Sequence, residues 1–203
     1  MSEWWTYRLG DFLMFSPATY WRMVGNYHRE TWPAQLIGLA GGGAALWLTT
    51  LRDTGAARLQ ALLLAIAWLW VGWAFHWQRY STINWAASYL AVAFAAQALM
   101  LVALAFTRRT EVAAAGHGAL QTTGWLLAVT GLVLYPLIGT WTGQPWNQLE
   151  IFGVSAEPTA LVSLGLLLAS RQQAPRWRHW MLAVIPALSL LAGAATLLAM
   201  ARL

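Results

Sequence analysis

The sequence lacks cysteine altogether, and only 9% of its 203 residues are charged. Without cysteine, the chain forms no disulfide, thiolate nucleophile or cysteine-ligated cluster. A soluble domain carries about 25% charged residues, so this chain has far too few to cover a globular surface. Hydrophobic residues make up 59% of the sequence. This composition excludes disordered, coiled-coil and ordinary cytosolic proteins, and it predicts an all-α integral membrane protein.

The charged residues are also limited in type and in their positions along the sequence. The twelve basic residues are all arginine, and the chain has neither the basic tail nor the recognition helix typical of nucleic-acid binding. No charged residue stands in the middle of an apolar stretch. Ion-coupled pumps usually place an ionisable group there, so such a pump is disfavoured unless Glu150 or Glu157 folds inward. A P-loop, a nucleophile elbow and a zinc-protease helix are absent as well, and no enzymatic activity is indicated.

Long apolar stretches predict a single bundle, residues 32–203, of about six transmembrane helices. The expected spans cover residues 32–51, 59–76, 83–106, 120–138, 158–170 and 180–200. The fifth stretch is well short of the roughly 20 residues that cross a bilayer. We therefore expect a half-helix or re-entrant segment there, or a span that borrows from the preceding sequence EIFGVSAE.

Residues 1–31 are interrupted by charge too often to form a span, but they are rich in aromatic residues. Ser16 followed by Pro17 is typical of a helix start, and an amphipathic helix is predicted from Pro17 to His28. Such a helix is expected to lie in the membrane interface with its rings at headgroup level. A surface anchor is the simpler interpretation of this arm, and a gating or lid element is the alternative.

Arginines near the ends of the predicted spans indicate the orientation. The loops after the second and fourth spans carry only Arg79, whereas those after the first, third and fifth carry Arg52, Arg58, Arg108, Arg109, Arg171, Arg176 and Arg178. The positive-inside rule places the arginine-rich loops in the cytoplasm and both termini outside. The arginines of the N-terminal arm favour the opposite orientation.

Polar and aromatic residues gather in three segments on the side opposite to these loops, residues 27–35, 73–87 and 134–159. Irregular segments at membrane depth are tolerated where they are buried in protein or line a wet cavity, so the third segment is expected to fold over the bundle. The three segments predict a substrate-binding site at the extracytoplasmic mouth, formed by His76, Tyr80, Asn84, Trp85, Tyr135, Glu150 and Glu157.

His76 is notable because tryptophans surround it on a predicted helix. It is interpreted as a structural or hydrogen-bonding residue, a proton relay, or a ligand of haem or a metal. Ligation needs a second ligand, which His28 or one of the two acids would supply, but no metal-binding spacing occurs on any helix. No cofactor is therefore predicted. Gly38 and Gly42 form a small-residue pair that permits close helix contact, either within the bundle or in a homo- or hetero-oligomer.

The runs YHRETWPAQ, YSTINWAA and LYPLIG, the last followed by EIFGVSAEPT, resemble a bacterial family of small polytopic inner-membrane proteins. That family is catalogued as a domain of unknown function, and some members are labelled permeases. The resemblance covers roughly residues 12 to 200. It implies about six helices and a location in the bacterial inner membrane. It brings no established activity, and the residues within the matching segments are Tyr80, Asn84, Trp85, Tyr135, Pro136 and Glu157.

Three functions fit these observations. The leading hypothesis is a small-solute permease or binding protein, because polar and aromatic groups cluster at one mouth of the bundle. The alternative is a non-transporting accessory or scaffold subunit, in which the fifteen tryptophans serve as membrane anchors and interface. The third is a haem or metal carrier. A water-accessible cavity would favour the first function, a closed bundle the second, and two histidines at one depth the third.

Overall fold

The computed structural model describes residues 13–51, 53–106, 118–170 and 176–202. These residues form helices and turns, and no strand occurs among them, as the composition predicts. The α-helices are α1 (Pro17–Glu30), α2 (Ala34–Thr50), α3 (Thr54–Trp70), α4 (Ala87–Phe106), α5 (Ala119–Val129), α6 (Tyr135–Trp141), α7 (Ala156–Ala169) and α8 (Arg176–Met200). Shorter helical turns are the π-helical η3 (Val71–Trp77) and η5 (Thr130–Leu134) and the 3₁₀ turns η4 (Tyr80–Thr82) and η6 (Trp146–Gln148).

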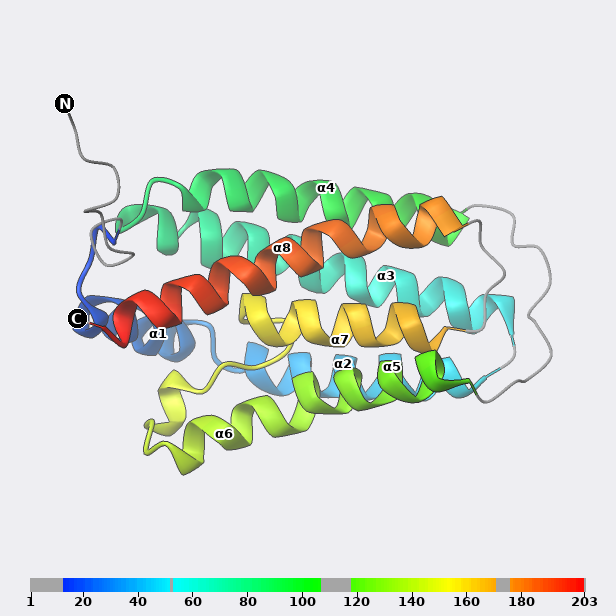
Figure 1. Ribbon diagram of the computed structural model, residues 1–203, viewed down its shortest axis with the longest axis horizontal. Coiled ribbons are helices and arrows are strands. Elements are labelled where there is room, and N and C mark those ends of the chain that lie inside the picture. The colour runs from blue at the N-terminus through cyan, green and yellow to red at the C-terminus, as the bar shows by residue number, and fades with distance from the viewer. Residues whose placement is uncertain (1–12, 52, 107–117, 171–175, 203) are drawn as a thin grey trace.

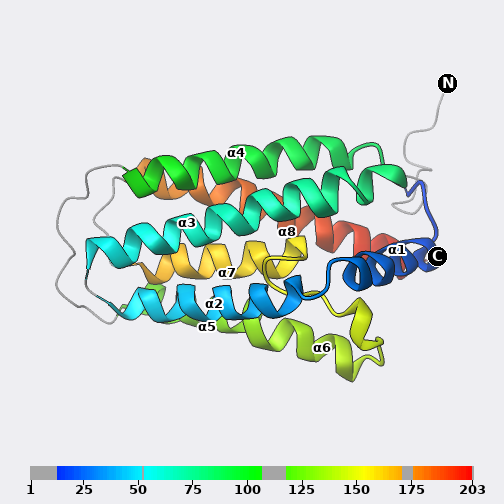
Figure 2. The same ribbon diagram turned by 180° about the vertical axis from the view of Figure 1, so that it is seen from behind.

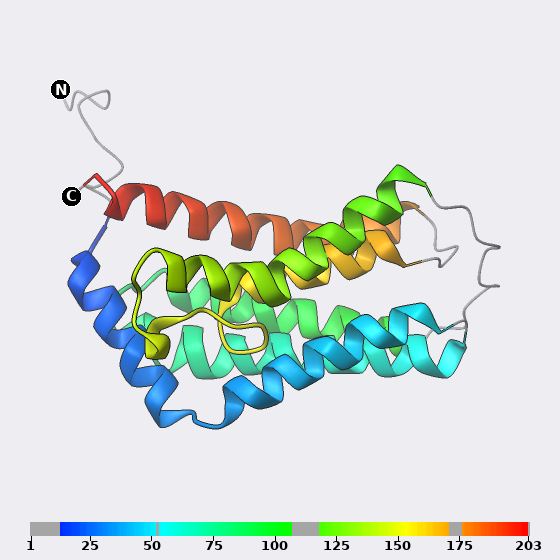
Figure 3. The same ribbon diagram turned by 90° about the horizontal axis from the view of Figure 1, so that it is seen from below.

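The long helices lie side by side along one axis (Figure 1). α3 packs against both α2 and α4, α7 packs against both α5 and α8, and α8 also contacts α4. Seen from behind, α1 and the C-terminus lie at the same end of the bundle (Figure 2). In Figure 3, α1 is set across this end instead of running along the bundle. We call it the α1 end, and the turn from α3 to α4 and the segment from α6 to α7 are found there too.

The structure corrects the predicted number of full-length spans. All six predicted apolar stretches are helical. Among the described residues, however, only four helical segments are long and apolar enough to cross a membrane: Thr54–Thr82, Ala87–Phe106, Ala119–Trp141 and Trp180–Met200. α2 has 17 residues. α7 has 14, as expected for the short fifth stretch. α7 is short because residues 151–155 form a turn, in which the N–H groups of Val154 and Ser155 donate to the Ile151 carbonyl, instead of extending its first turn.

Local side-chain chemistry explains where several helices begin. The Ser16 hydroxyl accepts from the Thr19 N–H at 3.2 Å, which caps α1. Asp53 caps α3 in the same way, accepting from the Ala56 N–H at 2.9 Å. Because of this cap, α3 starts several residues earlier than the hydropathy predicts. α4 starts later than predicted, since residues 80–86 form turns before it.

α1 confirms the predicted helix in the N-terminal arm and extends two residues further, to Glu30. Its inner face is buried against the bundle through Tyr20, Val24 and Tyr27, and the Tyr27 hydroxyl donates to the Val154 carbonyl at 3.1 Å. Glu30 forms an ion pair with Arg79. The helix is therefore attached to the protein, and its position in a membrane interface stays a prediction. Residues 1–12 of the arm lie outside the described residues.

Glycines allow the closest helix contacts in the bundle. Gly124 of α5 and Gly165 of α7 face each other so closely that a Cβ on Gly165 would lie 2.6 Å from the Gly124 carbonyl oxygen. Gly38 and Gly42, the predicted oligomer contact, instead face Phe152 of the same chain, because the buried turn before α7 occupies that side of α2. The association of this chain into oligomers stays a prediction, but these two glycines are already used within the protomer.

Most of the arginines that indicate the orientation lie outside the described residues: Arg52, Arg108, Arg109 and Arg171. Arg58 is described, and its Nε donates to the Ala105 carbonyl at 3.0 Å, which joins the start of α3 to the end of α4. The assignment of the arginine-rich loops to the cytoplasm is therefore unchanged as a prediction.

Candidate functional site

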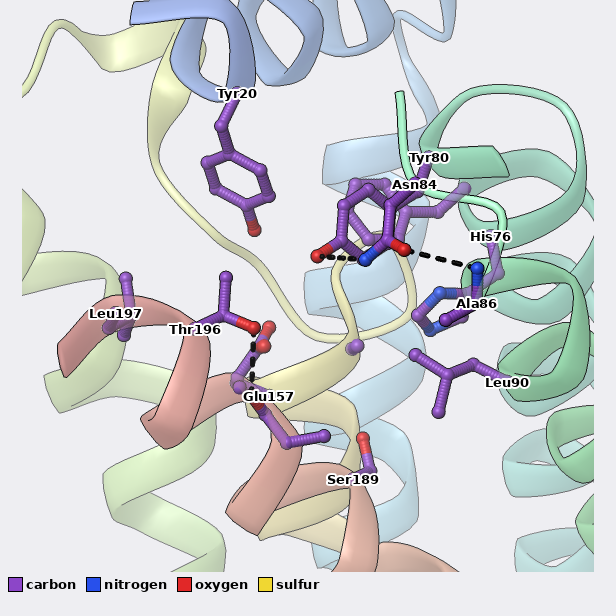
Figure 4. A pocket seen from close by; sticks show the side chains of 14 residues that line it. Tyr20, His76, Tyr80, Asn84, Ala86, Leu90, Glu157, Ser189, Thr196 and Leu197 are labelled. Carbon is purple, nitrogen blue, oxygen red and sulfur yellow. Dashed lines mark hydrogen bonds between the residues drawn. The ribbon is translucent and has the colours of Figure 1, made fainter. Parts of the chain in front are cut away.

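A partly enclosed cavity of about 230 Å³ lies at the α1 end of the bundle (Figure 4). It is formed where α1, η3, η4 and the first turns of α4 and α7 meet the C-terminal half of α8. Its polar side chains come from segments that are far apart in the sequence: His76, Tyr80, Asn84, Glu157, Ser189 and Thr196. Such a concave site, with a few converging polar groups among apolar walls, is the usual form of a small-molecule site.

His76 is the most deeply buried polar group of the cavity. It is only 3% exposed, and neither ring nitrogen has a hydrogen-bond partner. Its ring packs against Phe94, Phe75 and Tyr80, with centroid distances of 4.5, 5.2 and 6.0 Å. The residue belongs to the π-helical turn η3, a geometry that recurs at functional sites. A buried polar group without a partner is costly, so His76 is expected to have a partner in the working protein.

Tyr80 and Asn84 form the wall next to His76. The Asn84 amide donates to the Tyr80 hydroxyl at 3.2 Å, and its carbonyl oxygen accepts from the Ala86 N–H at 3.1 Å. This second bond holds the turn that precedes α4. The Tyr80 hydroxyl also interacts with the Thr196 side chain across the cavity. The two residues therefore present a fixed hydroxyl to the cavity.

Glu157 enters the cavity from the first turn of α7. A carboxylate is favourable at that position, because the helix N-terminus carries partial positive charge. One of its oxygens, Oε2, is sealed from solvent and has no hydrogen-bond partner. The other, Oε1, lies so close to Gly193 of α8 that a Cβ there would overlap it. The absence of a side chain at position 193 therefore makes room for the carboxylate.

Glu150 lies beside the cavity without lining it. It is buried in the segment before α7, and its Oε1 accepts from the Tyr20 hydroxyl at 3.4 Å. Tyr135 also forms a hydrogen bond with it. Burial and then the charge of Glu157 raise the pKa of Glu150 above its ordinary value. Tyr20 lines the cavity, so it connects the cavity to this second acid.

The structure thus brings together four of the seven predicted site residues, His76, Tyr80, Asn84 and Glu157. Glu150 and Tyr135 stand next to each other behind Tyr20. Trp85 is separate, because it is 59% exposed and packs against Tyr89 on the outside. It follows Asn84 in a turn, so when Asn84 points inward its neighbour points outward.

Ten further residues line the cavity and were not anticipated, and four of them contribute a hydroxyl or make room for Glu157: Tyr20, Ser189, Gly193 and Thr196. The three on α8 are spaced four and three residues apart, which places them on one face of a helix. A search for small and polar residues at helical spacing could have found that face in the sequence. Tyr20 carried no such signal, since it is one of many aromatic residues in the N-terminal arm.

His28, the proposed partner of His76 for a haem or metal, faces a different group. Its Nε2 lies 3.5 Å from the Ser155 hydroxyl, and the ring contacts that link it to His76 run through Tyr27 and Phe75. Within the described part of the chain, no three His, Asp or Glu side chains are grouped as a metal site would need. The arrangement therefore gives no support to His28 as a second ligand.

His28 makes stability depend on pH. Burial lowers its pKa to about 4, although a hydrogen bond with the Asn147 backbone acts in the other direction. The unfolded chain binds a proton near pH 6.5 and the folded chain only near pH 4, so stability is lost as the pH falls through this window. We expect His28→Asn to remove up to about 3 kcal/mol of this pH dependence.

Thermal unfolding of both proteins between pH 4 and 7 measures the effect. Glu150, with its raised pKa, changes stability in the opposite direction, but it is present in both proteins and cancels in their difference. Equal slopes for the wild type and His28→Asn would show that His28 is not buried as described.

The fold and its cavity define an all-helical protein with helices that are long and apolar enough to cross a membrane. Residues 18–202 match DUF6064, a family of unknown function, and the chain belongs to that family. No curated protein and no solved structure matches the chain. The resemblance inferred from the sequence motifs is thus confirmed as far as a family of unknown function. Bacterial inner-membrane location and permease activity stay predictions.

Proposed function

We propose that this protein spans the bacterial inner membrane and binds a small solute in the cavity at the α1 end, as the first step of its passage. The observation that carries the proposal is His76, a buried and unpartnered side chain facing a cavity of about 230 Å³. A polar residue in that position is costly unless a ligand or water completes its hydrogen bonds.

The outer surface supports a membrane location. Large apolar side chains such as Ile37, Leu99 and Leu191 are 66–69% exposed on the outward faces of their helices. A soluble monomer rarely exposes contiguous apolar surface on that scale. In this proposal α2 and α7 complete a six-helix bundle, and their shorter lengths are accommodated by local thinning of the bilayer. The positive-inside rule then puts the cavity on the extracytoplasmic side.

Water access to the cavity tests the proposal. Because the chain has no cysteine, each single-cysteine variant reports on one position. Ser189 is buried and lines the cavity, whereas its neighbour Leu188 is 59% exposed on the outside of α8. In proteoliposomes we expect methyl methanethiosulfonate to modify Ser189→Cys but not Leu188→Cys. The reaction requires a thiolate, which forms in water and not in lipid.

The competing functions give different results in this experiment. An unreactive Ser189→Cys would mean a sealed bundle, which favours the accessory or scaffold subunit and contradicts a solute site. Passage is measured separately by the osmotic swelling of proteoliposomes in urea and glycerol, before and after modification of Ser189→Cys. A haem carrier would show a Soret band in the purified protein that disappears in His76→Ala.

A further inference from the structure

We propose that the solute is a small organic cation with a primary ammonium group, and that Glu157 binds its charge; this inference rests on the proposed solute site. The charge of the cavity, the hydrogen-bond acceptors that face it, and its size and aromatic walls favour this ligand.

The charge of the cavity favours a cation. Glu157 is the acidic residue of the lining, and the described residues that line the cavity include no arginine. Its Oε2 is sealed from solvent without any partner. An ionised carboxylate in such a place is costly when it is alone, and a cation beside it removes that cost. At short range and in a partly enclosed site, this attraction is stronger than between exposed charges.

The acceptors around the cavity match the three N–H donors of a primary ammonium group. Glu157 offers the free Oε2. His76 has no partner on either nitrogen, and a neutral imidazole presents one acceptor. The Thr196 hydroxyl donates to the Ala192 carbonyl at 2.9 Å, so its oxygen can accept from a ligand in addition to its interaction with Tyr80. These groups belong to three different elements, α7, η3 and α8, and surround the same space (Figure 4).

The walls and the volume restrict the size of the ligand. Tyr80 packs against both Tyr20 and Phe75 with ring centroids 5.8 Å apart, and all three rings line the cavity. Aromatic rings attract a cation that lies within about 6 Å of their faces. Sites for drug-sized ligands enclose about 300–1,000 Å³, so a cavity near 230 Å³ fits an amine with only a few heavy atoms.

The proposal is tested on Ser189→Cys in proteoliposomes with three probes of similar size: ethylammonium, ethanol and acetate. We expect ethylammonium alone to slow the modification of the thiol by methyl methanethiosulfonate. In Glu157→Gln this protection should require about 10- to 100-fold more ethylammonium, the range for losing a charged hydrogen-bond partner. Glu30→Gln is the matched control, because it removes an exposed acid at the same end of the bundle and should leave protection unchanged.

A second variant tests the role of the Glu157 carboxylate without replacing it, so the proposal can be tested even where Glu157→Gln does not fold. Gly193→Ala keeps the carboxylate but displaces it, because the new Cβ overlaps Oε1, and it should weaken protection as well. Equal protection by ethanol and ethylammonium, unaffected by Glu157→Gln, would contradict the proposal that the ligand is a cation. It would still support a solute site. The cation proposal would also be contradicted if acetate protected the thiol, or if the thiol reacted and no probe protected it. A thiol that never reacts would contradict the solute site itself.

Discussion

Alanine at position 165 is expected to destabilise the protein by about 2 kcal/mol or more, although the substitution adds only one methyl group. Gly165 lies where α7 crosses α5. A Cβ there would overlap the backbone nitrogen of Ala128 and lie 2.6 Å from the carbonyl oxygen of Gly124. Both neighbours are backbone atoms of a helix, so no side chain can rotate away. The helices must separate, and the packing between them is lost. Thermal unfolding of the purified protein, followed by size-exclusion chromatography, measures the effect.

Two comparisons make this prediction specific. Gly43→Ala on α2 meets no atom within 4 Å, and it should be neutral or slightly stabilising because alanine favours a helix by about 1 kcal/mol over glycine. Gly124→Ala should destabilise like Gly165→Ala, since the two glycines share one contact. The double variant should cost less than the sum of the two, because the helices have already separated. A stable Gly165→Ala would refute the close crossing of α5 and α7.

Replacing Trp68 with alanine is expected to cost about 3–5 kcal/mol and to disturb the cavity. Trp68 is 0% exposed, and its indole N–H donates to the Ser163 hydroxyl at 2.8 Å, which joins α3 to α7. Its ring packs against Phe94 at 4.3 Å, and Phe94 packs in turn against His76. The substitution therefore removes an interhelical hydrogen bond, leaves a hole in the core and withdraws the support behind His76.

Trp73 provides the matched control on the same continuous helix. It is 54% exposed on the outside, so Trp73→Ala should change the unfolding temperature little. In a membrane the ring of Trp73 contacts lipid, and the alanine of the variant contacts lipid too, so little packing within the protein is lost. Trp68→Phe separates the two losses of Trp68→Ala, because it keeps much of the volume and removes the hydrogen bond. Comparable unfolding temperatures for Trp68→Ala and Trp73→Ala would show that the indole of Trp68 is not a core contact.

Most of the helical architecture could be predicted from the sequence. The shortage of charge and the long apolar stretches indicated the helices, and the Ser16–Pro17 pair indicated the start of α1. These are local properties, because capping and helix formation depend on neighbouring residues and on the solvent around them. The number of full-length spans is lower than the predicted six, because α2 and α7 are short. Gly153 has a φ of +76°, and its N–H donates to the Thr159 hydroxyl. Together they make a turn within the segment EIFGVSAE, so α7 borrows only Ala156 and Glu157 from it and stays as short as its apolar stretch indicated.

The site was predictable only in part. The one-sided clustering of polar residues indicated the end of the bundle where the cavity lies, and it singled out His76, Tyr80, Asn84 and Glu157. It included Trp85 because the sequence does not say which of two adjacent residues in a turn faces inward. The clustering did not include the α8 face with Gly193, because the role of that glycine can be recognised only when α8 is packed against α7.

Composition, hydropathy and capping residues therefore determined that this protein is all-helical and which of its segments are helices. Only the tertiary structure decided that Glu157 and Gly193 meet, that Tyr20 connects the cavity to Glu150, and that Phe152 packs against Gly38 and Gly42. The physical reason is the range of the interactions. A helix is stabilised by bonds between residues four apart, whereas the cavity is made of side chains from distant parts of the chain, whose positions depend on how whole helices pack.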